Sequence, residues 1–246
     1  MTKLWEEKDL LKQMERKSIQ TLVYEELKKN IMSMKLKPGQ AMSTQEIATK
    51  LNVSRTPVRE AFLRLQTEGL VEMIPQRETV VSKIQMKRVD QEKFIRECLE
   101  LGVINSFLEK KNREAIQKMA RLIELQKHCS EEGDFAGFLD ADDLFHKVLF
   151  DVTGQQMAWE IITGRNGHYN RLRMLFIQRE GTVKSSIEQH TEIVRLLEKG
   201  QEECIRKALT SHIQRFDVDK TGLITAYPDY FDGGEGEGHE WRIGAL

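Results

Sequence analysis

Four polar residues in the C-terminal half have the types and spacing of metal ligands. Asp142 and His146 are four residues apart, so on a helix their side chains project from the same face. His190 and His212 fall on two other predicted helices and can reach the same point inside a bundle. A carboxylate and three imidazoles suit one divalent transition metal per chain, such as zinc, nickel or manganese. The spacing alone favours the alternative, polar residues that share no ligand.

A second group of residues has the chemistry of DNA recognition. Ser54, Arg55, Thr56 and Arg59 begin a predicted helix, and the two arginines lie on the side away from its apolar residues. An arginine fork can bond the O6 and N7 atoms of guanine, whereas hydroxyl groups and a helix N-terminus suit phosphate oxygens. Arginines on an exposed helix face are often simply solvated. Here the helix before them, the tight turn and the strands after them favour a DNA-binding role.

The elements that carry these arginines follow the order of a winged helix-turn-helix. Apolar periodicity and N-cap residues predict three helices, and β-rich runs on either side of Pro75 predict two strands. Pro38 and Gly39 form a turn between the first two helices. The predicted helices cover residues 18–34, 43–51 and 55–68, and the strands cover 70–74 and 79–82.

The remainder of the chain is predicted to be a helical bundle. Proline is absent from residue 89 to residue 227, and glycines punctuate a helical pattern of apolar residues. The predicted helices cover residues 89–112, 113–130, 134–152, 155–178, 182–199 and 201–216. Gly164 and Gly167 can kink or split the fourth of them. The fold class is therefore mainly α, with an N-terminal winged helix-turn-helix domain and an all-helical bundle of six to seven helices.

Four segments follow from this pattern. They are an N-terminal arm (1–16), a winged helix-turn-helix domain (17–83), a helical domain (84–220) and a C-terminal tail (221–246). The tail loses the periodicity, and its Gly-Glu repeat at 233–238 is typical of a flexible linker. We expect removal of the tail to leave dimerisation and DNA binding unchanged if it is solvated. Its aromatic residues, which include Trp241, can instead dock at a place that the sequence does not give.

Composition fits a protein that binds a polyanion at one end. Residues 1–90 carry 17 Lys+Arg against 12 Asp+Glu, whereas the rest of the 246 residues carry 21 against 27. No run of about 18 apolar residues is present, and the acidic N-terminus is unlike a signal peptide. We therefore expect a cytoplasmic protein with no membrane association. Three widely spaced cysteines indicate neither a disulfide framework nor a thiolate zinc site.

The sequence around the recognition arginines resembles the GntR family of bacterial regulators. The segments SRTPVREAFLRL (54–65) and EGLVEMIP (68–75) carry the similarity, which extends over residues 19–82. The resemblance implies that Arg55 and Arg59 contact bases and that Gln45 faces the DNA backbone. It also implies that Ser54, Thr56 and Arg77 contact phosphate or the minor groove. One departure is Glu78, since the family usually has glycine at this wing-tip position and a carboxylate there would repel phosphate.

The helical half resembles the FCD type of GntR effector domain. The segments DDLFHKVLF (142–150), SIEQH (186–190) and the residues from 208 to 212 carry this similarity. The resemblance implies a bundle in which Asp142, His146, His190 and His212 hold a metal that ligates a small carboxylate. Arg96 and Arg173 match positions where the family has cationic side chains in or near the pocket. Surface salt bridges, such as Arg96 with Glu97 or Glu100, are the alternative for these arginines.

Together these features predict a transcriptional regulator and not an enzyme. The expected partners are operator DNA, a small organic-acid effector and a second copy of the chain in a homodimer. An architectural DNA-binding dimer without effector is one alternative. A metal-dependent hydrolase or lyase fused to a DNA-binding domain is another, although the sequence lacks motifs such as HExxH or GxSxG. The operator, the effector, the metal and the sign of regulation are not determined by the sequence.

Overall fold

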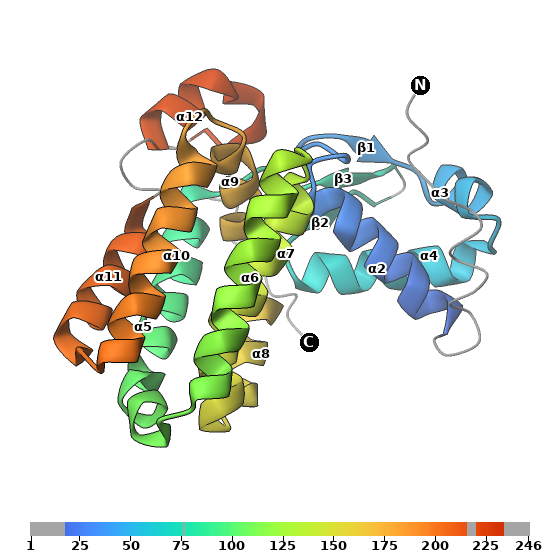
Figure 1. The fold of residues 1–246 in the computed structure, drawn as a ribbon. Helices are drawn as coiled ribbons and strands as arrows, with labels where there is room; N and C mark the ends of the chain where they lie inside the picture. The colour runs from blue at the N-terminus through green and yellow to red at the C-terminus, as the bar shows by residue number, and fades with distance from the viewer. Residues whose placement is uncertain (1–17, 76, 216–219, 234–246) are drawn as a thin grey trace, which may run out of the picture.

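A computed structural model describes residues 18–75, 77–215 and 220–233, which form two domains joined at residues 82–85 (Figure 1). The predicted fold class is confirmed, because a small winged domain precedes a helical bundle. The predicted arm at residues 1–16 and Trp241 lie outside the described residues. In the described part of the chain, no helix has the length and apolar character needed to cross a membrane.

The N-terminal domain packs three helices against a three-stranded sheet. Buried residues from all three helices, such as Leu27, Ile47 and Phe62, form a single core with Leu70 and Val81 of the wing region. The elements are α2 (Ile19–Met32), β1 (Ala41–Met42), α3 (Thr44–Leu51), α4 (Arg55–Thr67), β2 (Val71–Met73) and β3 (Thr79–Val81).

Local sequence fixes where α3 ends and α4 begins. The Ser43 hydroxyl accepts a hydrogen bond from the Glu46 amide and so caps α3. Asn52 adopts the left-handed conformation (φ 52°), which asparagine tolerates, and so turns the chain after α3. Ser54 then precedes α4; it is exposed and makes no side-chain capping bond.

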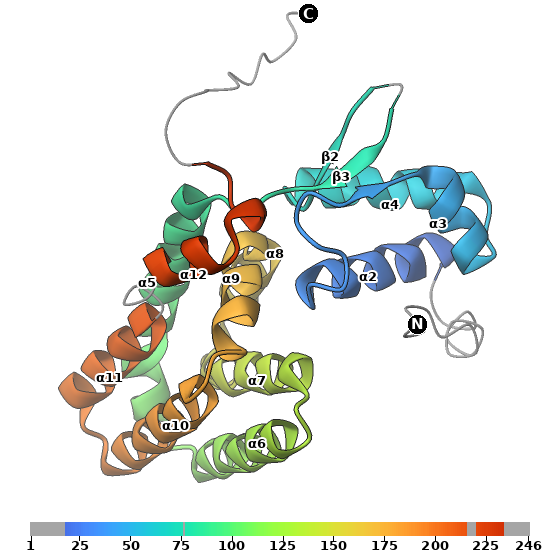
Figure 2. The same ribbon diagram turned by 90° about the horizontal axis from the view of Figure 1, so that it is seen from above.

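The sheet has the order β1-β3-β2, and both pairings are antiparallel. Val71 pairs with Val81 and Met73 with Thr79, which makes β2 and β3 a hairpin that projects beside α4 (Figure 2). The strand β1 was not predicted. It has two residues and is paired through Ala41 with Val80 of β3.

The C-terminal domain is a bundle in which α6 lies along both α7 and α10, and α5 contacts α7, α9 and α11. Its core is aliphatic and aromatic, with Phe107, Phe145, Leu149, Ile193 and Leu209 fully or almost fully buried. The helices are α5 (Met86–Lys110), α6 (Arg113–Glu131), α7 (Phe135–Thr153), α8 (Gln156–Gly164), α9 (Gly167–Ile177), α10 (Thr182–Lys199) and α11 (Glu202–Gln214).

One predicted helix is divided in the structure. The segment predicted as a single helix over 155–178 forms α8 and α9, which are separated at Arg165 and Asn166. Gly167 then starts α9 against the N-terminal domain, because a Cβ atom there would lie 2.6 Å from the Leu70 side chain. The split therefore allows α9 to enter the space between the two domains.

The chain beyond α11 packs on the domain junction. Residues 220–233, here called the C-terminal strap, contain α12 (Lys220–Ala226) and a short 3-10 helix (Pro228–Tyr230). Leu223 and Phe231 are buried against a cluster that includes Ile84 and Tyr169. The Ile84 amide donates to the Tyr230 carbonyl, and the Asp232 amide donates to the Ile84 carbonyl. This part of the predicted tail is therefore folded onto the linker between the domains.

Candidate metal centre and DNA-binding surface

Three helices bring the four predicted metal ligands together inside the bundle. Asp142 and His146 project from α7, His190 from α10 and His212 from α11. One donor atom from each residue can be chosen so that all four lie within 4.8 Å of one another, and all four residues are buried. Residues up to 70 positions apart in sequence therefore form one cluster.

Each imidazole uses its Nδ1 atom to contact an oxygen, and this contact turns its Nε2 atom toward the centre. His146 Nδ1 donates to the Glu100 carboxylate at 2.6 Å. The other pairs are His190 with Gln126 at 2.8 Å and His212 with Gln189 at 3.0 Å. Such bonds leave the proton on Nδ1 and fix the tautomer that metal-binding histidines use.

The Nε2 atoms consequently face one another with their lone pairs. His212 Nε2 lies 3.2 Å from His146 Nε2 and 3.0 Å from His190 Nε2. Three unprotonated nitrogens cannot satisfy one another by hydrogen bonding. The Arg215 guanidinium donates to one of these atoms, His212 Nε2, at 2.6 Å. A metal ion among the three nitrogens would serve all of them, so the donor set fits a metal ion.

The fourth ligand has one oxygen held and one oxygen directed at the imidazoles. Asp142 Oδ2 accepts from Arg173 at 2.5 Å. Among the described residues, Asp142 Oδ1 is buried without a hydrogen-bond partner; it lies 3.5 Å from His190 Nε2 and 3.6 Å from a guanidinium nitrogen of Arg215. An orphaned buried carboxylate oxygen beside three imidazole lone pairs is a second observation that fits a metal.

Burial and the surrounding cations keep Asp142, His190 and His212 in the protonation states that a metal requires. Desolvation holds the pKa of His190 and of His212 well below the usual histidine value, so both rings are neutral. Burial opposes the ionisation of Asp142, but the buried cations around it, first Arg173 and also Arg215, outweigh burial and hold the pKa of that carboxyl far below its usual value. Ligands that are already deprotonated bind a metal without first losing a proton.

The two arginines predicted near the effector lie behind Asp142, on the side held by Oδ2. Arg96 pairs with Glu100 at 2.7 Å and with Asp143 at 3.1 Å, and it is almost completely buried. Arg173 pairs with Asp142 and with Asp143 at 2.7 Å. The salt-bridge alternative with Glu100 is thus seen for Arg96, although the pair is internal and not on the surface.

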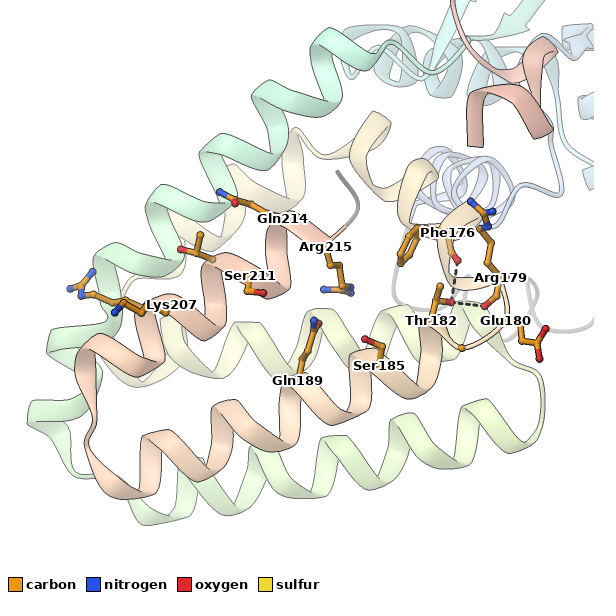
Figure 3. A pocket seen from close by; sticks show the side chains of 13 residues that line it. Phe176, Arg179, Glu180, Thr182, Ser185, Gln189, Lys207, Ser211, Gln214 and Arg215 are labelled. Atoms are coloured by element: carbon orange, nitrogen blue, oxygen red, sulfur yellow. Dashed lines mark hydrogen bonds between the residues drawn. The ribbon is translucent and has the colours of Figure 1, made fainter. Parts of the chain in front are cut away.

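A groove of about 1210 Å³ runs between α10 and α11 beside the cluster (Figure 3). Arg215 extends from α11 toward Gln189 and Ser185 of α10, as Figure 3 shows. Its guanidinium also donates to His212 Nε2 at 2.6 Å, which links the groove to the cluster. Most of the other lining side chains are hydroxyl, amide or cationic groups, including Thr182, Thr210, Ser211, Gln214, Arg179 and Lys207.

The sequence pattern did not identify several residues of this site. Arg215 follows His212 by three positions and so shares its helix face, which was an available signal. Glu100, Gln126 and Gln189 orient the imidazoles, but the first two belong to α5 and α6, far from the histidines in sequence. Their role depends on how the helices pack.

The predicted DNA contacts gather on one face of the N-terminal domain. A groove of about 830 Å³ between α4 and the wing is lined by Arg55, Thr56, Arg59 and Arg77. Glu78 lines the same groove, so the wing presents a carboxylate close to its arginine. On α4, the side chains of Arg55, Thr56 and Arg59 are exposed. The opposite side of the helix buries Val58, Phe62 and Leu65.

Gln45 lies where it can orient one of these arginines. Its side-chain oxygen accepts a hydrogen bond from Arg55 Nε, and its nitrogen donates to Thr49. This bond uses Nε of Arg55 and not its two terminal nitrogens. Ser54 is exposed beside them at the start of α4.

Comparison with known families covers both domains. The family described as "Bacterial regulatory proteins, gntR family" matches residues 19–81, and the FCD domain matches residues 94–215. The chain belongs to the GntR family. Its helical bundle is an FCD domain, as the resemblance of its sequence implied. The protein is therefore a transcriptional regulator and not an enzyme.

Related GntR proteins align over most of this chain. The transcriptional repressor RspR of Escherichia coli K12 is 28% identical over 209 residues, which cover 85% of this chain and 92% of RspR. A probable D-xylose utilization operon repressor of Paenarthrobacter nicotinovorans is 26% identical, covering 83% and 90%. The solved structure of E. coli McbR is 22% identical with a TM-score of 0.71, covering 86% and 99%, and so shares the fold.

Proposed function

We propose that this GntR regulator binds operator DNA as a homodimer and responds to a small carboxylate held at a metal centre in its FCD domain. The observation that carries the proposal is the convergence of four buried donor atoms, three imidazole nitrogens and one carboxylate oxygen, within 4.8 Å of one another. Asp142, His146, His190 and His212 would hold the ion. Because three imidazoles and one carboxylate can leave positions open, the metal would supply a positive centre for an anionic oxygen.

The chain's own residues near the cluster suit a hydroxylated carboxylate. Arg215 offers a guanidinium whose side chain is 8% exposed, and Ser185, Gln189 and Ser211 offer further polar groups that line the groove. Arginine forks bind carboxylates in a bidentate manner, and hydroxyl and amide groups bond substrate hydroxyls. Since one relative is named for D-xylose utilization, sugar acids are the first carboxylates to test.

The DNA-binding half of the proposal rests on α4 and the wing. Arg55 and Arg59 would contact base edges in the major groove, while Ser54, Thr56 and Arg77 would contact phosphate or the minor groove. Gln45 would support Arg55 as it does in the free protein. A regulator of bacterial genes would carry out this work in the cytoplasm.

The homodimer is supported by apolar side chains that the single chain leaves exposed on the bundle. Phe94 of α5 is 64% exposed and Met157 of α8 is 74% exposed. Leu144 and Ile161 are also exposed, on α7 and α8. These residues lie on α5, α7 and α8, which contact one another, and a second copy packed on these helices would bury exposed apolar surface.

Elemental analysis of purified protein tests the metal centre. We expect about one zinc, nickel or manganese ion per chain in the wild type, and its loss in His190→Ala and in His212→Ala. His128→Ala is the matched control, because His128 is exposed on α6. Equal metal contents in all four proteins, or no metal in the wild type after incubation with each ion, would refute the centre.

Thermal unfolding with organic acids tests the effector. Aldonic and short hydroxy acids should raise the melting temperature of the metal-loaded wild type, because a ligand stabilises the state that binds it. The same acids should have no effect on His212→Ala. A shift of equal size in both proteins would place the carboxylate elsewhere.

A further inference from the structure

The helix α9 lies between the metal cluster and the DNA-binding domain, and it is enclosed by the rest of the molecule. It packs against α2 of the N-terminal domain and against α5, α7 and α10 of the bundle. Among the described residues, Arg171 and Arg173 are the largest side chains that are fully buried. Residues two apart on a helix point to different sides, so these two arginines contact different partners.

Arg173 joins α9 to the metal cluster. Its guanidinium bonds Asp142 Oδ2 at 2.5 Å, so it holds the oxygen of the candidate ligand that faces away from the imidazoles. The hydroxyl of Tyr169, on the same helix, donates to the Ile213 carbonyl, which adjoins His212. A change of charge or position at the cluster therefore acts directly on α9.

Arg171 joins α9 to the DNA-binding domain. Its guanidinium donates to the Ser82 carbonyl at 2.5 Å and to the Ser82 hydroxyl at 3.1 Å. That hydroxyl donates in turn to the Gly69 carbonyl, and the Ser82 amide donates to the Leu70 carbonyl. Gly69 and Leu70 connect the recognition helix α4 to the wing, so Arg171 is two hydrogen bonds from the DNA-reading elements.

The start of α9 is fixed on both sides. The Glu92 carboxylate of α5 accepts from the amides of His168 and Tyr169 at 2.9 and 2.8 Å. The His168 ring accepts from the Gln85 amide in the interdomain linker at 3.0 Å. With Gly167 packed directly on Leu70, the end of α9 cannot shift without moving the linker or the wing base.

The contact between Arg171 and Ser82 is costly to break. In the described part of the chain, the hydrogen bonds of this guanidinium all go to carbonyl, hydroxyl or imidazole groups. Burial lowers the pKa of Arg171 to about 10. A buried cation that loses its hydrogen bonds keeps its desolvation cost, so the linker and α9 are expected to move together.

We propose that α9 couples the metal-centred site to the DNA-binding domain, with Arg173 holding Asp142 at one end and Arg171 holding Ser82 at the other. The inference rests on the proposed function, since the signal is occupancy of the Asp142 and histidine site. Occupancy would alter how firmly the linker and wing base are held. By thermodynamic linkage, DNA binding would alter the affinity of the site by the same factor.

Hydrogen exchange with zinc as the probe tests this coupling. The Ser82 and Gln85 amides report on the junction, and α10 reports on the site itself. We expect zinc to slow exchange in α10 and to change exchange of both junction amides by about tenfold, within the range usual for coupled sites. In Arg171→Met the α10 response should remain while the junction response is lost. Ser82→Ala, which removes one acceptor, should show a partial loss.

The control keeps the same substitution at an exposed place. Arg195→Met removes an arginine of α10 that pairs with Glu192 on the surface, and it should leave both responses unchanged. A zinc response in α10 with unchanged junction amides in the wild type would overturn the coupling and leave the metal centre standing. A junction response that survives in Arg171→Met would overturn it as well.

Failure of the proposed function gives a different result. If zinc leaves α10 unchanged, the metal centre is refuted, and Asp142→Asn in metal-free protein then decides the coupling. This substitution removes the charge that Arg173 holds. Faster exchange at the Ser82 and Gln85 amides would support the role of α9, and unchanged exchange there would overturn it.

Discussion

Replacing Glu100 by glutamine changes the charge behind one candidate metal ligand with little change of shape. The carboxylate accepts from His146 Nδ1 at 2.6 Å and from Arg96 Nε at 2.7 Å, and it is fully buried. Burial opposes its ionisation, but His146 and Arg96 outweigh this and hold the pKa of Glu100 below its usual value. Glu100 is therefore an anion that makes His146 a stronger electron donor.

The size of the effect follows from the strength of that one hydrogen bond. A bond to a charged acceptor contributes about 1.5–3 kcal/mol, and a neutral one about 1 kcal/mol. Glu100→Gln can keep a neutral bond, so the expected loss is about 1–2 kcal/mol of metal-binding free energy. This corresponds to a zinc affinity roughly 5–30-fold weaker. Arg96 retains Asp143 as a partner, which limits the damage to the fold.

The measurement is competition for zinc between the protein and a chromophoric chelator at pH 7.5. Glu124→Gln is the matched control, since Glu124 is exposed on α6 and pairs with Lys127. Urea unfolding of the metal-free proteins shows whether a weaker affinity reflects a weaker fold. An unchanged zinc affinity in a folded Glu100→Gln protein would show that His146 is not a ligand or that Glu100 does not orient it.

Three further predictions concern the other parts of the molecule. Arg55→Ala or Arg59→Ala should cost about 1–3 kcal/mol in binding to a selected operator while the melting temperature stays the same; normal binding by both variants would refute the recognition surface. Burial raises the pKa of Glu92 from 4.5 to about 7, so the folded protein holds this proton more tightly than the unfolded chain, and the stability that it contributes is lost as pH rises from 4.5 to 7. Glu92→Gln should therefore reduce the fall in unfolding free energy between pH 5 and 8 by about 3 kcal/mol. Urea unfolding of both proteins at each pH measures this, and the same pH dependence in wild type and variant would contradict it. Leu223→Ala should lower the unfolding free energy by about 2–5 kcal/mol because this side chain is fully buried, whereas Ile224→Ala, at 38% exposure, should cost much less. Equal unfolding free energies of the two variants in urea would show that the strap does not dock.

Local patterns were sufficient to predict most helices, and the resemblance to FCD domains indicated which polar residues would cluster inside the bundle. Apolar periodicity and glycine stops placed the helix ends within a few residues, and Gly154 and Gly200 do end α7 and α10 in the left-handed conformation. The spacing of Asp142 and His146 required only a helix. These features depend on neighbours in sequence, which is why the sequence alone revealed them.

Features that depend on packing were not accessible in the same way. The strand β1 has two residues, too few to show alternation, and exists because β3 offers an edge. The place where the strap docks is set by Ile84 and Tyr169, which are remote from it in sequence. The contacts of Arg96 and Arg173 with Asp142 also depend on how α5 and α9 pack against α7, and their predicted role near an effector stays a prediction.

The joint between the domains falls outside both family-matched spans. The gntR-family span covers residues 19–81, and the FCD span covers residues 94–215. Ser82, Ile84, Glu92 and the strap lie between or beyond them, yet they make the contacts that seat the winged domain on the bundle. A chimeric biosensor that joins the winged domain of one regulator to the bundle of another at the ends of these spans would lose these contacts. Exchange of DNA specificity between such regulators therefore requires that residues 82–93 and 220–233 be inherited together with the bundle.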